Sequence, residues 1–187
     1  MSKEAPGRLQ LVQDFINTAD LETGDDRLAT TERLEAWLTE RRLVGEPPPV
    51  DSDGRELATA LALREALRAL CLANNGEDPT GDRLALLKAT ENLHLHLTAR
   101  FGADGGIELE PDEVGVRHGL AEILTIVFES LHDGSWSRLK ACASDSCQWA
   151  FYDHSRNRSG HWCSMEGCGN RAKVRSYRAR QAPAGGA

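Results

Sequence analysis

Hydrophobic residues return at helical spacing through most of the first 135 residues. The longest such stretch runs from Pro111 to about His132, where apolar residues recur every three or four positions, as on one face of an α-helix. Its apolar stripe consists of Val116, Leu120, Ile123, Leu124, Val127, Phe128 and Leu131. We expect a core helix here, which Pro111 and Asp112 open and Gly134 ends.

Shorter helices are expected upstream. One covers about residues 30–43 and starts at a threonine, a residue type that caps helix N-termini. The next starts at Asp51 or Asp53 and ends at Asn74-Asn75-Gly76. A run of prolines at residues 47–49 separates these two helices as a stiff linker. A further short helix is expected over residues 84–89.

A change of period predicts strands in the middle of the chain. Residues 93–101 begin with leucines that alternate with polar residues, and residues 107–110 alternate again. Because glycines lie between the two runs, we expect them to pair as a β-hairpin. His94 and His96 would then share one face of a strand. A solvated sheet face is the favoured interpretation, and metal binding or pH sensing is the alternative.

The N-terminal segment Leu9–Thr18 has an ambiguous period that fits either a strand or a short helix. Its polar residues Asp14, Asn17 and Thr18 are candidates for a ligand pocket. Local chemistry favours the alternative that they cap or shape a turn.

Length and composition are those of a globular protein with room for one medium domain and a small module. The 187 residues are 40% hydrophobic and 27% charged. No apolar run approaches the ~18 residues of a membrane helix, and the N-terminus lacks the cationic-then-apolar pattern of a secretion signal. We therefore expect a cytoplasmic protein without a membrane partner.

Charge is divided unevenly along the chain. From Arg138 onward there are nine Lys/Arg and three Asp/Glu, a surplus of +6, although the net charge of the whole chain is −7. The remaining residues therefore carry −13. A basic end on an acidic body is typical of a chain whose end binds nucleic acid.

Four of the five cysteines form two pairs of equal spacing. Cys142 and Cys147 enclose four residues, as do Cys163 and Cys168, and fifteen residues separate the pairs. In a reducing compartment this spacing favours a metal site over disulfides. Four thiolates can surround one zinc ion at ~2.3 Å and leave no open position for water. The fifth cysteine, Cys71, lies in a helical pattern and is expected to be buried.

The spacing therefore predicts one structural zinc ion. A module of about forty residues has little other core. Trp149, Phe151 and Trp162 are expected to pack beneath the metal. Chelation is expected to unfold residues 142–180 while the helical body persists.

A basic helix is predicted after the last cysteine. It begins near residues 165–168 and ends near Gln181, with Val174 and Tyr177 forming a narrow stripe that packs on the module. Its basic residues could bind phosphates or guanine edges, and a solvated helix face is the alternative. The candidate nucleic-acid contacts are Arg171, Lys173, Arg175, Arg178 and Arg180, joined by Arg156 and Arg158 in a polar connector whose turn Asp153 and Ser155 are expected to fix.

This part of the chain resembles the CGNR zinc finger, which is named for the residues found here as Cys168-Gly169-Asn170-Arg171. The resemblance covers about residues 138–180 and includes both cysteine pairs and the segment from Trp149 to Arg158. Two positions depart from the family pattern. Gly160-His161 stand where family members commonly carry basic residues, and His154 stands where they tend to have threonine. The first departure lowers the share of DNA binding expected of the connector.

In that family the finger follows an N-terminal domain called ABATE, found in stress-induced bacterial transcription regulators. Leu9–Thr18 resembles, more loosely, the opening motif of that domain, which reads close to Leu-Asp-Phe-x-Asn-Thr. The resemblance implies a DNA-binding transcription regulator whose acidic domain senses a small-molecule effector or forms a homodimer, and which associates with the nucleoid when bound to DNA.

The expected fold class is α+β. Residues 1–135 form a mostly helical N-terminal domain with a small β-hairpin, residues 136–181 a zinc-stabilised β/α module, and residues 182–187 a disordered tail. The alternative function is a zinc-dependent protein-interaction or RNA-binding module without sequence-specific DNA readout. An enzyme is not expected, because no nucleophile–base spacing or phosphate-binding glycine loop is present.

Overall fold

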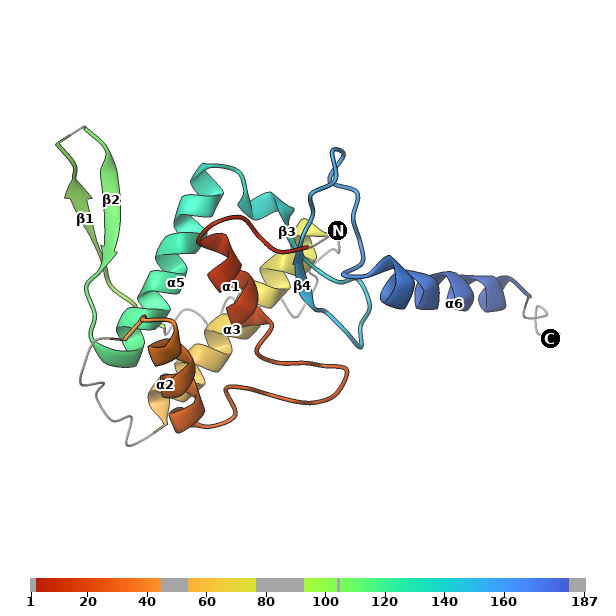
Figure 1. Cartoon of the computed structure of the whole chain (residues 1–187), viewed down its shortest axis with the longest axis horizontal. Helices are drawn as coiled ribbons and strands as arrows, with labels where there is room; N and C mark the ends of the chain where they lie inside the picture. Colours follow the sequence, from red (N-terminus) through yellow and green to blue (C-terminus); the bar gives the residue numbers. More distant parts are fainter. Residues whose placement is uncertain (1–2, 45–53, 77–92, 104, 182–187) are drawn as a thin grey trace.

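A helical core carries two small antiparallel β-hairpins and a long C-terminal helix (Figure 1). The computed structural model describes residues 3–44, 54–76, 93–103 and 105–181. The helix expected over residues 84–89 and the caps expected at Asp51 or Asp53 lie outside these ranges. Within them, helices and strands mix as expected of an α+β protein.

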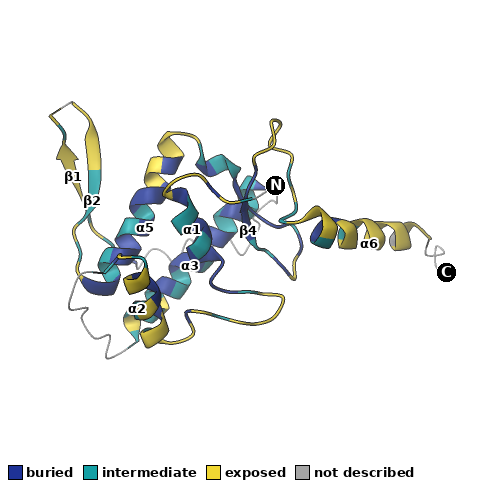
Figure 2. Cartoon of the chain, in the orientation of Figure 1, coloured by how far each residue is buried: buried dark blue, intermediate teal, exposed yellow. Residues whose placement is uncertain are grey.

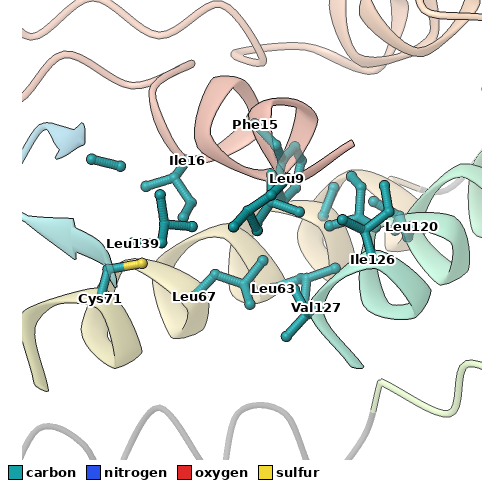
Figure 3. Packing of buried hydrophobic residues seen from close by; sticks show 14 of the residues in the cluster. Leu9, Phe15, Ile16, Leu63, Leu67, Cys71, Leu120, Ile126, Val127 and Leu139 are labelled. Carbon is teal, nitrogen blue, oxygen red and sulfur yellow. The ribbon is translucent and has the colours of Figure 1, made fainter. Parts of the chain in front are cut away.

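Three helices enclose the centre of the core: α1 (Leu9–Ile16), α3 (Arg55–Asn74) and α5 (Gly115–His132). Figure 3 shows the side chains of α1 above those of α3 and α5. The residues that meet there include Leu9, Phe15, Ile16, Leu63, Leu67, Cys71, Leu120, Ile126 and Val127. The ambiguous N-terminal segment is thus a helix, because its apolar residues share one buried face. Cys71 is fully buried as predicted, and burial raises the pKa of its thiol.

The helix α2 (Thr31–Glu40) covers one end of this core. As predicted, a threonine caps it: the Thr30 side chain accepts a hydrogen bond from the Arg33 amide at 3.4 Å. Its Trp37 ring lies 5.6 Å from that of Phe15, between ring centroids. α3 ends at the expected place, with Asn75 after its last residue and Gly76 at φ +81°.

The first hairpin pairs β1 (Leu97–Phe101) with β2 (Ile107–Pro111), as the alternating pattern predicts. The first strand starts later than expected, so His94 and His96 precede it, and their predicted common strand face is wrong. His94 has a left-handed φ of +30°, which breaks the extended conformation. The His96 ring instead reaches Glu113, with Nδ1 2.8 Å from the carboxylate.

The central helix α5 ends at His132 as predicted but begins later than expected. It begins at Gly115 because Pro111 pairs with Leu97 in the hairpin, and Gly115 adopts the left-handed φ of +61° where the chain turns into the helix. Phe128 and Leu131 were expected in the core but are 46% and 58% exposed. At this end of α5, Val127 is buried as predicted, and the other buried positions are Ile126 and Ser130.

The second hairpin, β3 (Leu139–Ala141) with β4 (Ala150–Tyr152), joins the same core. β3 packs on α3, and β4 contacts α1. Trp136, Leu139, Ala141, Ala150 and Tyr152 all belong to the main hydrophobic cluster. The core is therefore continuous across residue 135, where the body was expected to end.

The last helix, α6 (Asn170–Gln181), extends away from the rest of the molecule (Figure 1). It follows a π-helical segment, η2 (Met165–Gly169), which supplies most of its contacts. Figure 2 shows most of α6 and the tip of the first hairpin as exposed. None of the helices in the described ranges combines the length and apolarity needed to cross a membrane.

Candidate metal centre and basic helix

Four cysteines converge where the second hairpin meets η2. Cys142 directly follows β3, Cys147 lies three residues before β4, and Cys168 lies within η2. The Sγ atoms of Cys142, Cys147, Cys163 and Cys168 all lie within 4.8 Å of one another. Cys163 Sγ is 3.7 Å from both Cys147 Sγ and Cys168 Sγ. Four sulfurs held tetrahedrally at ~2.3 Å from one zinc ion would be about 3.8 Å apart, so the cluster fits the metal.

The cluster is enclosed by protein on most sides. Cys142, Cys147 and Cys168 are buried and Cys163 is half-buried. Trp149 and Trp162 pack against the cysteines as predicted. Phe151 is fully buried, but it lies under the Lys3 ammonium, 4.3 Å from the ring centroid, and does not belong to the cysteine cluster.

Backbone turns set the two cysteine pairs. In the first, the Ser144 carbonyl accepts hydrogen bonds from the amides of Cys147 at 2.8 Å and Gln148 at 3.0 Å. In the second, the Ser164 side chain caps η2 by accepting from the Gly167 amide at 3.1 Å. These turns direct the cysteine sulfurs towards one point.

Crowding four thiols changes their acidity in opposite directions. Hydrogen bonds from Cys147 and Cys163 lower the pKa of Cys142, because they stabilise its thiolate. The bond to Cys142 raises the pKa of Cys147, and the bonds to Cys142 and Cys147 raise the pKa of Cys163. Without a cation, thiolates this close repel one another. A divalent ion allows all four to ionise together.

A buried ion pair fixes the connector after β4. Lys140 Nζ lies 2.9 Å from Asp153 Oδ2, and both side chains are 4% exposed. Burial raises the pKa of Asp153, but hydrogen bonds from Ser155 and Lys140 outweigh it and hold the pKa below its usual range. The predicted turn-making role of Asp153 and Ser155 is confirmed: Asp153 accepts from the Ser155 amide at 3.0 Å, and Ser155 Oγ accepts from the Ser159 amide at 3.1 Å.

The same carboxylate accounts for Gly160. Asp153 Oδ2 accepts a hydrogen bond from the Gly160 amide at 2.7 Å. A Cβ on Gly160 would lie 2.9 Å from Asp153 Cγ, which is too close for any side chain. A larger side chain at residue 160 would therefore displace the Asp153 carboxylate.

The basic residues of α6 fall into two groups. Lys173, Arg175, Arg178 and Arg180 are exposed along the projecting helix. Arg171 is held at its base: Nη2 donates to Cys168 Sγ at 3.0 Å, and both Nη atoms pair with the Glu22 carboxylate. The predicted packing of Val174 and Tyr177 is wrong, because these side chains are 47% and 59% exposed. α6 points outward, so the module offers them no surface.

The connector arginines lie in another part of the module. Arg156 and Arg158 are exposed, and Arg158 Nη1 donates to Ser137 Oγ at 2.9 Å. The connector loop and α6 leave the module in different directions (Figure 1).

The candidate ligand residues near α1 contact the protein itself. The Asn17 side chain hydrogen bonds with the Ala150 backbone, and Thr18 Oγ1 donates to the Phe15 carbonyl at 2.8 Å. Asp14 is half-buried and accepts from Gln10 Nε2 at 2.7 Å. These hydrogen bonds satisfy the side chains of Asn17 and Thr18 within the protein. They favour a structural role for the two residues over the ligand pocket.

Sequence reasoning missed two residues of the site. Glu22 reaches Arg171 from 149 positions away, and no local pattern marks it. The Lys140–Asp153 pair follows from the strand register, because Lys140 lies opposite Phe151 and Asp153 is two positions further along the chain, directly after β4. Such diagonal cross-strand neighbours share one face and are within reach of a long side chain.

Comparison with known families agrees with this geometry. A family model described as "CGNR zinc finger" matches residues 138–181. Another, ABATE, described as "Putative stress-induced transcription regulator", matches residues 9–131. No match was found among curated proteins. With its sulfur geometry and the finger match, the cysteine cluster is a site for one structural zinc ion.

Proposed function

The chain belongs to the ABATE family of stress-induced transcription regulators and ends in a CGNR zinc finger, and on this premise we propose that it binds duplex DNA through α6. Both matching families are regulator or zinc-finger types. The zinc would serve as scaffold, because four cysteine ligands leave no coordination position for a substrate.

The exposure of α6 is the observation that carries this proposal. Its twelve residues, about 18 Å of helix, include no acidic residue. Lys173, Arg175, Arg178 and Arg180 are all exposed on it. A helix of this diameter fits the DNA major groove, where arginine pairs with guanine edges and with phosphates. A shallow recess beside η2, lined by Asn170, Val174, Arg175 and Arg178 among others, adds polar and apolar groups to the same face.

The body would supply a second binding unit. Four exposed basic side chains on one helix neutralise few phosphates, so one finger binds weakly. We propose that residues 1–135 act as the dimerisation or sensing unit and residues 136–181 as the DNA-binding module. Two linked fingers on paired half-sites gain affinity through linkage. Arg156 and Arg158 would add phosphate contacts from the connector loop, in another part of the module.

Salt dependence tests the DNA proposal. Zinc-loaded protein is titrated into labelled duplexes selected from a random pool, with fluorescence anisotropy read at several salt concentrations. If the four exposed basic residues neutralise phosphates, the slope of log K against log salt should be about −3 to −4 per protomer. Arg175→Gln with Arg178→Gln should make the slope shallower by about 2. The control is Arg27→Gln, an exposed arginine of the body. A slope near zero, or an equal slope in the α6 variant, contradicts the proposal.

The exposed Val174 and Tyr177 favour one alternative, a protein or RNA partner for the same helix. A basic helix with an apolar stripe is suited to an acidic protein groove, and tyrosine can stack on unpaired bases. Competition of the labelled duplex with unlabelled single-stranded RNA and with an acidic protein separates the alternatives. If either competitor displaces the duplex at equal concentration, that competitor is the preferred partner and the DNA proposal is wrong.

A further inference from the structure

We propose that Arg171 is a positioning residue that joins the zinc site to the body, and not one of the residues that contact nucleic acid. Its guanidinium lies between two anions. Nη2 donates to Cys168 Sγ at 3.0 Å and lies 3.1 Å from Glu22 Oε2, while Nη1 pairs with Glu22 Oε1. An arginine guanidinium stays charged at any ordinary pH.

The contact with Cys168 acts on the metal site. Four thiolates around one zinc ion carry a net charge of about −2. A guanidinium that donates to one of the sulfurs offsets part of this charge and holds the thiolate in place. Outer partners of metal ligands typically change metal affinity by about 10-fold to 100-fold. Arg171 is such an outer partner, because it is positively charged and its Nη2 lies 3.0 Å from Cys168 Sγ.

The contact with Glu22 acts on the direction of α6. The main contacts of α6 are with η2, so few interactions fix its angle to the body. Glu22 lies in a turn that is itself held, since Asp20 Oδ1 accepts from the Glu22 amide at 2.8 Å and Ala19 pairs with Asp26. The pair is about half exposed, so its effect on overall stability is small and its effect on orientation is the important one.

The geometry requires arginine at this position. A planar guanidinium can give two parallel hydrogen bonds to a carboxylate and a third to the sulfur. A lysine ammonium at the same place keeps the charge but cannot hold that fork. Both Nη atoms of Arg171 are engaged by Glu22 and Cys168, so a DNA phosphate would compete with Glu22 for them. Arg175 and Arg178 are exposed one and two turns further along α6.

The test measures zinc affinity and helix motion in the full chain without DNA. The variants are Arg171→Lys, Arg171→Gln and Glu22→Gln, with Arg175→Lys as the matched control on the same helix. Zinc affinity is measured by competition with a chromophoric chelator, and the motion of α6 by ¹⁵N relaxation of its amides. We expect both Arg171 variants to lose about 10-fold in zinc affinity and to loosen α6. Glu22→Gln should loosen α6 while keeping zinc affinity within about 2-fold of the parent.

Two results would overturn the proposal. One is a zinc affinity of Arg171→Gln within about 2-fold of the parent. The other is α6 relaxation in Glu22→Gln that matches the Arg175→Lys control. One further measurement, duplex binding, rests on the proposed function. Glu22→Gln should weaken duplex binding and leave the salt slope unchanged. Loss of a phosphate contact would make the slope shallower by about 0.9, and Arg171→Gln should not show this change. If no variant and no parent protein binds DNA, the proposed function fails, and zinc affinity and relaxation still decide the role of Arg171.

Discussion

The side chain of Asn17 is hydrogen bonded at both ends to the backbone of Ala150. Asn17 Oδ1 accepts from the Ala150 amide at 2.7 Å, and Nδ2 donates to the Ala150 carbonyl at 2.9 Å. Asn17 ends α1, and Ala150 begins β4 three residues after a zinc cysteine. The Asn17 side chain therefore makes the two backbone hydrogen bonds that a neighbouring strand would otherwise make with Ala150. These bonds attach the zinc module to the N-terminal helix.

Asn17→Ala should destabilise the whole protein. The substitution leaves the buried Ala150 amide without its partner and leaves the Ala150 carbonyl only the longer bond from Gln13 Nε2 at 3.3 Å. An unsatisfied buried group costs about 1–3 kcal/mol. We expect a loss of about 3 kcal/mol in the free energy of unfolding, read from urea denaturation of the zinc-loaded chain. Asn157→Ala, in the exposed connector, is the control, with an expected change within about 0.5 kcal/mol. Equal losses in the two variants would contradict this role for Asn17.

Zinc removal should affect the two halves of the module differently. β3 and β4 belong to the main core, and body side chains hold their backbone, as when Asn75 Nδ2 donates to the Ala141 carbonyl at 2.8 Å. Besides the exposed Arg171–Glu22 pair, Cys163 and Cys168 attach η2 and α6 to the cluster. Chelation should therefore strip hydrogen-exchange protection from η2 and α6 first, while β3–β4 amides stay protected. This is narrower than the loss over residues 142–180 that the sequence alone suggests. Simultaneous loss of protection in β4 and α6 would restore the broader expectation.

The features predicted correctly from sequence are local ones. The cysteine spacing predicts a four-sulfur site because each pair closes a short turn. The absence of acidic residues in α6 predicts a basic helix independently of its surroundings. Alternation found the first hairpin for the same reason, since strand pairing across a short glycine turn depends on nearby residues.

The features missed depend on contacts across the chain. Glu22 meets Arg171 over 149 positions, and neither residue type nor spacing indicates the pair. Val174 and Tyr177 form an apolar stripe, and only the outward direction of α6 shows that the stripe packs on nothing within the described chain. Phe128 continues the apolar pattern of α5 but is exposed, because what packs on a helix decides which face is buried.

Gly160→Ala should disturb the connector. The new Cβ would lie 2.9 Å from both Cγ and Oδ1 of Asp153, whose carboxylate is held by Lys140 and cannot move away freely. We expect a loss of about 1–3 kcal/mol in the free energy of unfolding, as for overpacking in a filled site. Gly167→Ala is the control in the same module, because a Cβ there is 3.6 Å from its nearest neighbour, Ser164 Oγ, an ordinary contact. If Gly160→Ala lowers the free energy of unfolding no more than the control does, the Asp153 carboxylate can move aside and the prediction is wrong.

Glu113 should make the base of the first hairpin sensitive to acid. Hydrogen bonds from Arg117, at 3.0 Å, and from His96 outweigh burial and lower the pKa of Glu113 from 4.5 to about 2. A carboxyl whose pKa is lower in the folded than in the unfolded state stabilises the fold above the unfolded value and loses that effect as pH falls through the folded value. The contribution should therefore be complete above about pH 5 and fade between about pH 4.5 and 2.

Comparing Glu113→Gln with the parent chain at several pH values tests this linkage. At pH 7 the variant should be less stable by about 1 kcal/mol, the usual net value of a charged hydrogen bond in partly exposed surroundings. The difference should shrink towards zero by about pH 2. Urea midpoints are measured with chelator present throughout, so that loss of zinc in acid does not enter the comparison. Glu108→Gln, on the exposed side of the same hairpin, should change stability by no more than about 0.5 kcal/mol. A Glu113→Gln difference that stays constant from pH 7 to pH 2 would mean that the Glu113 carboxylate and its partners Arg117 and His96 do not stabilise the hairpin base through charge.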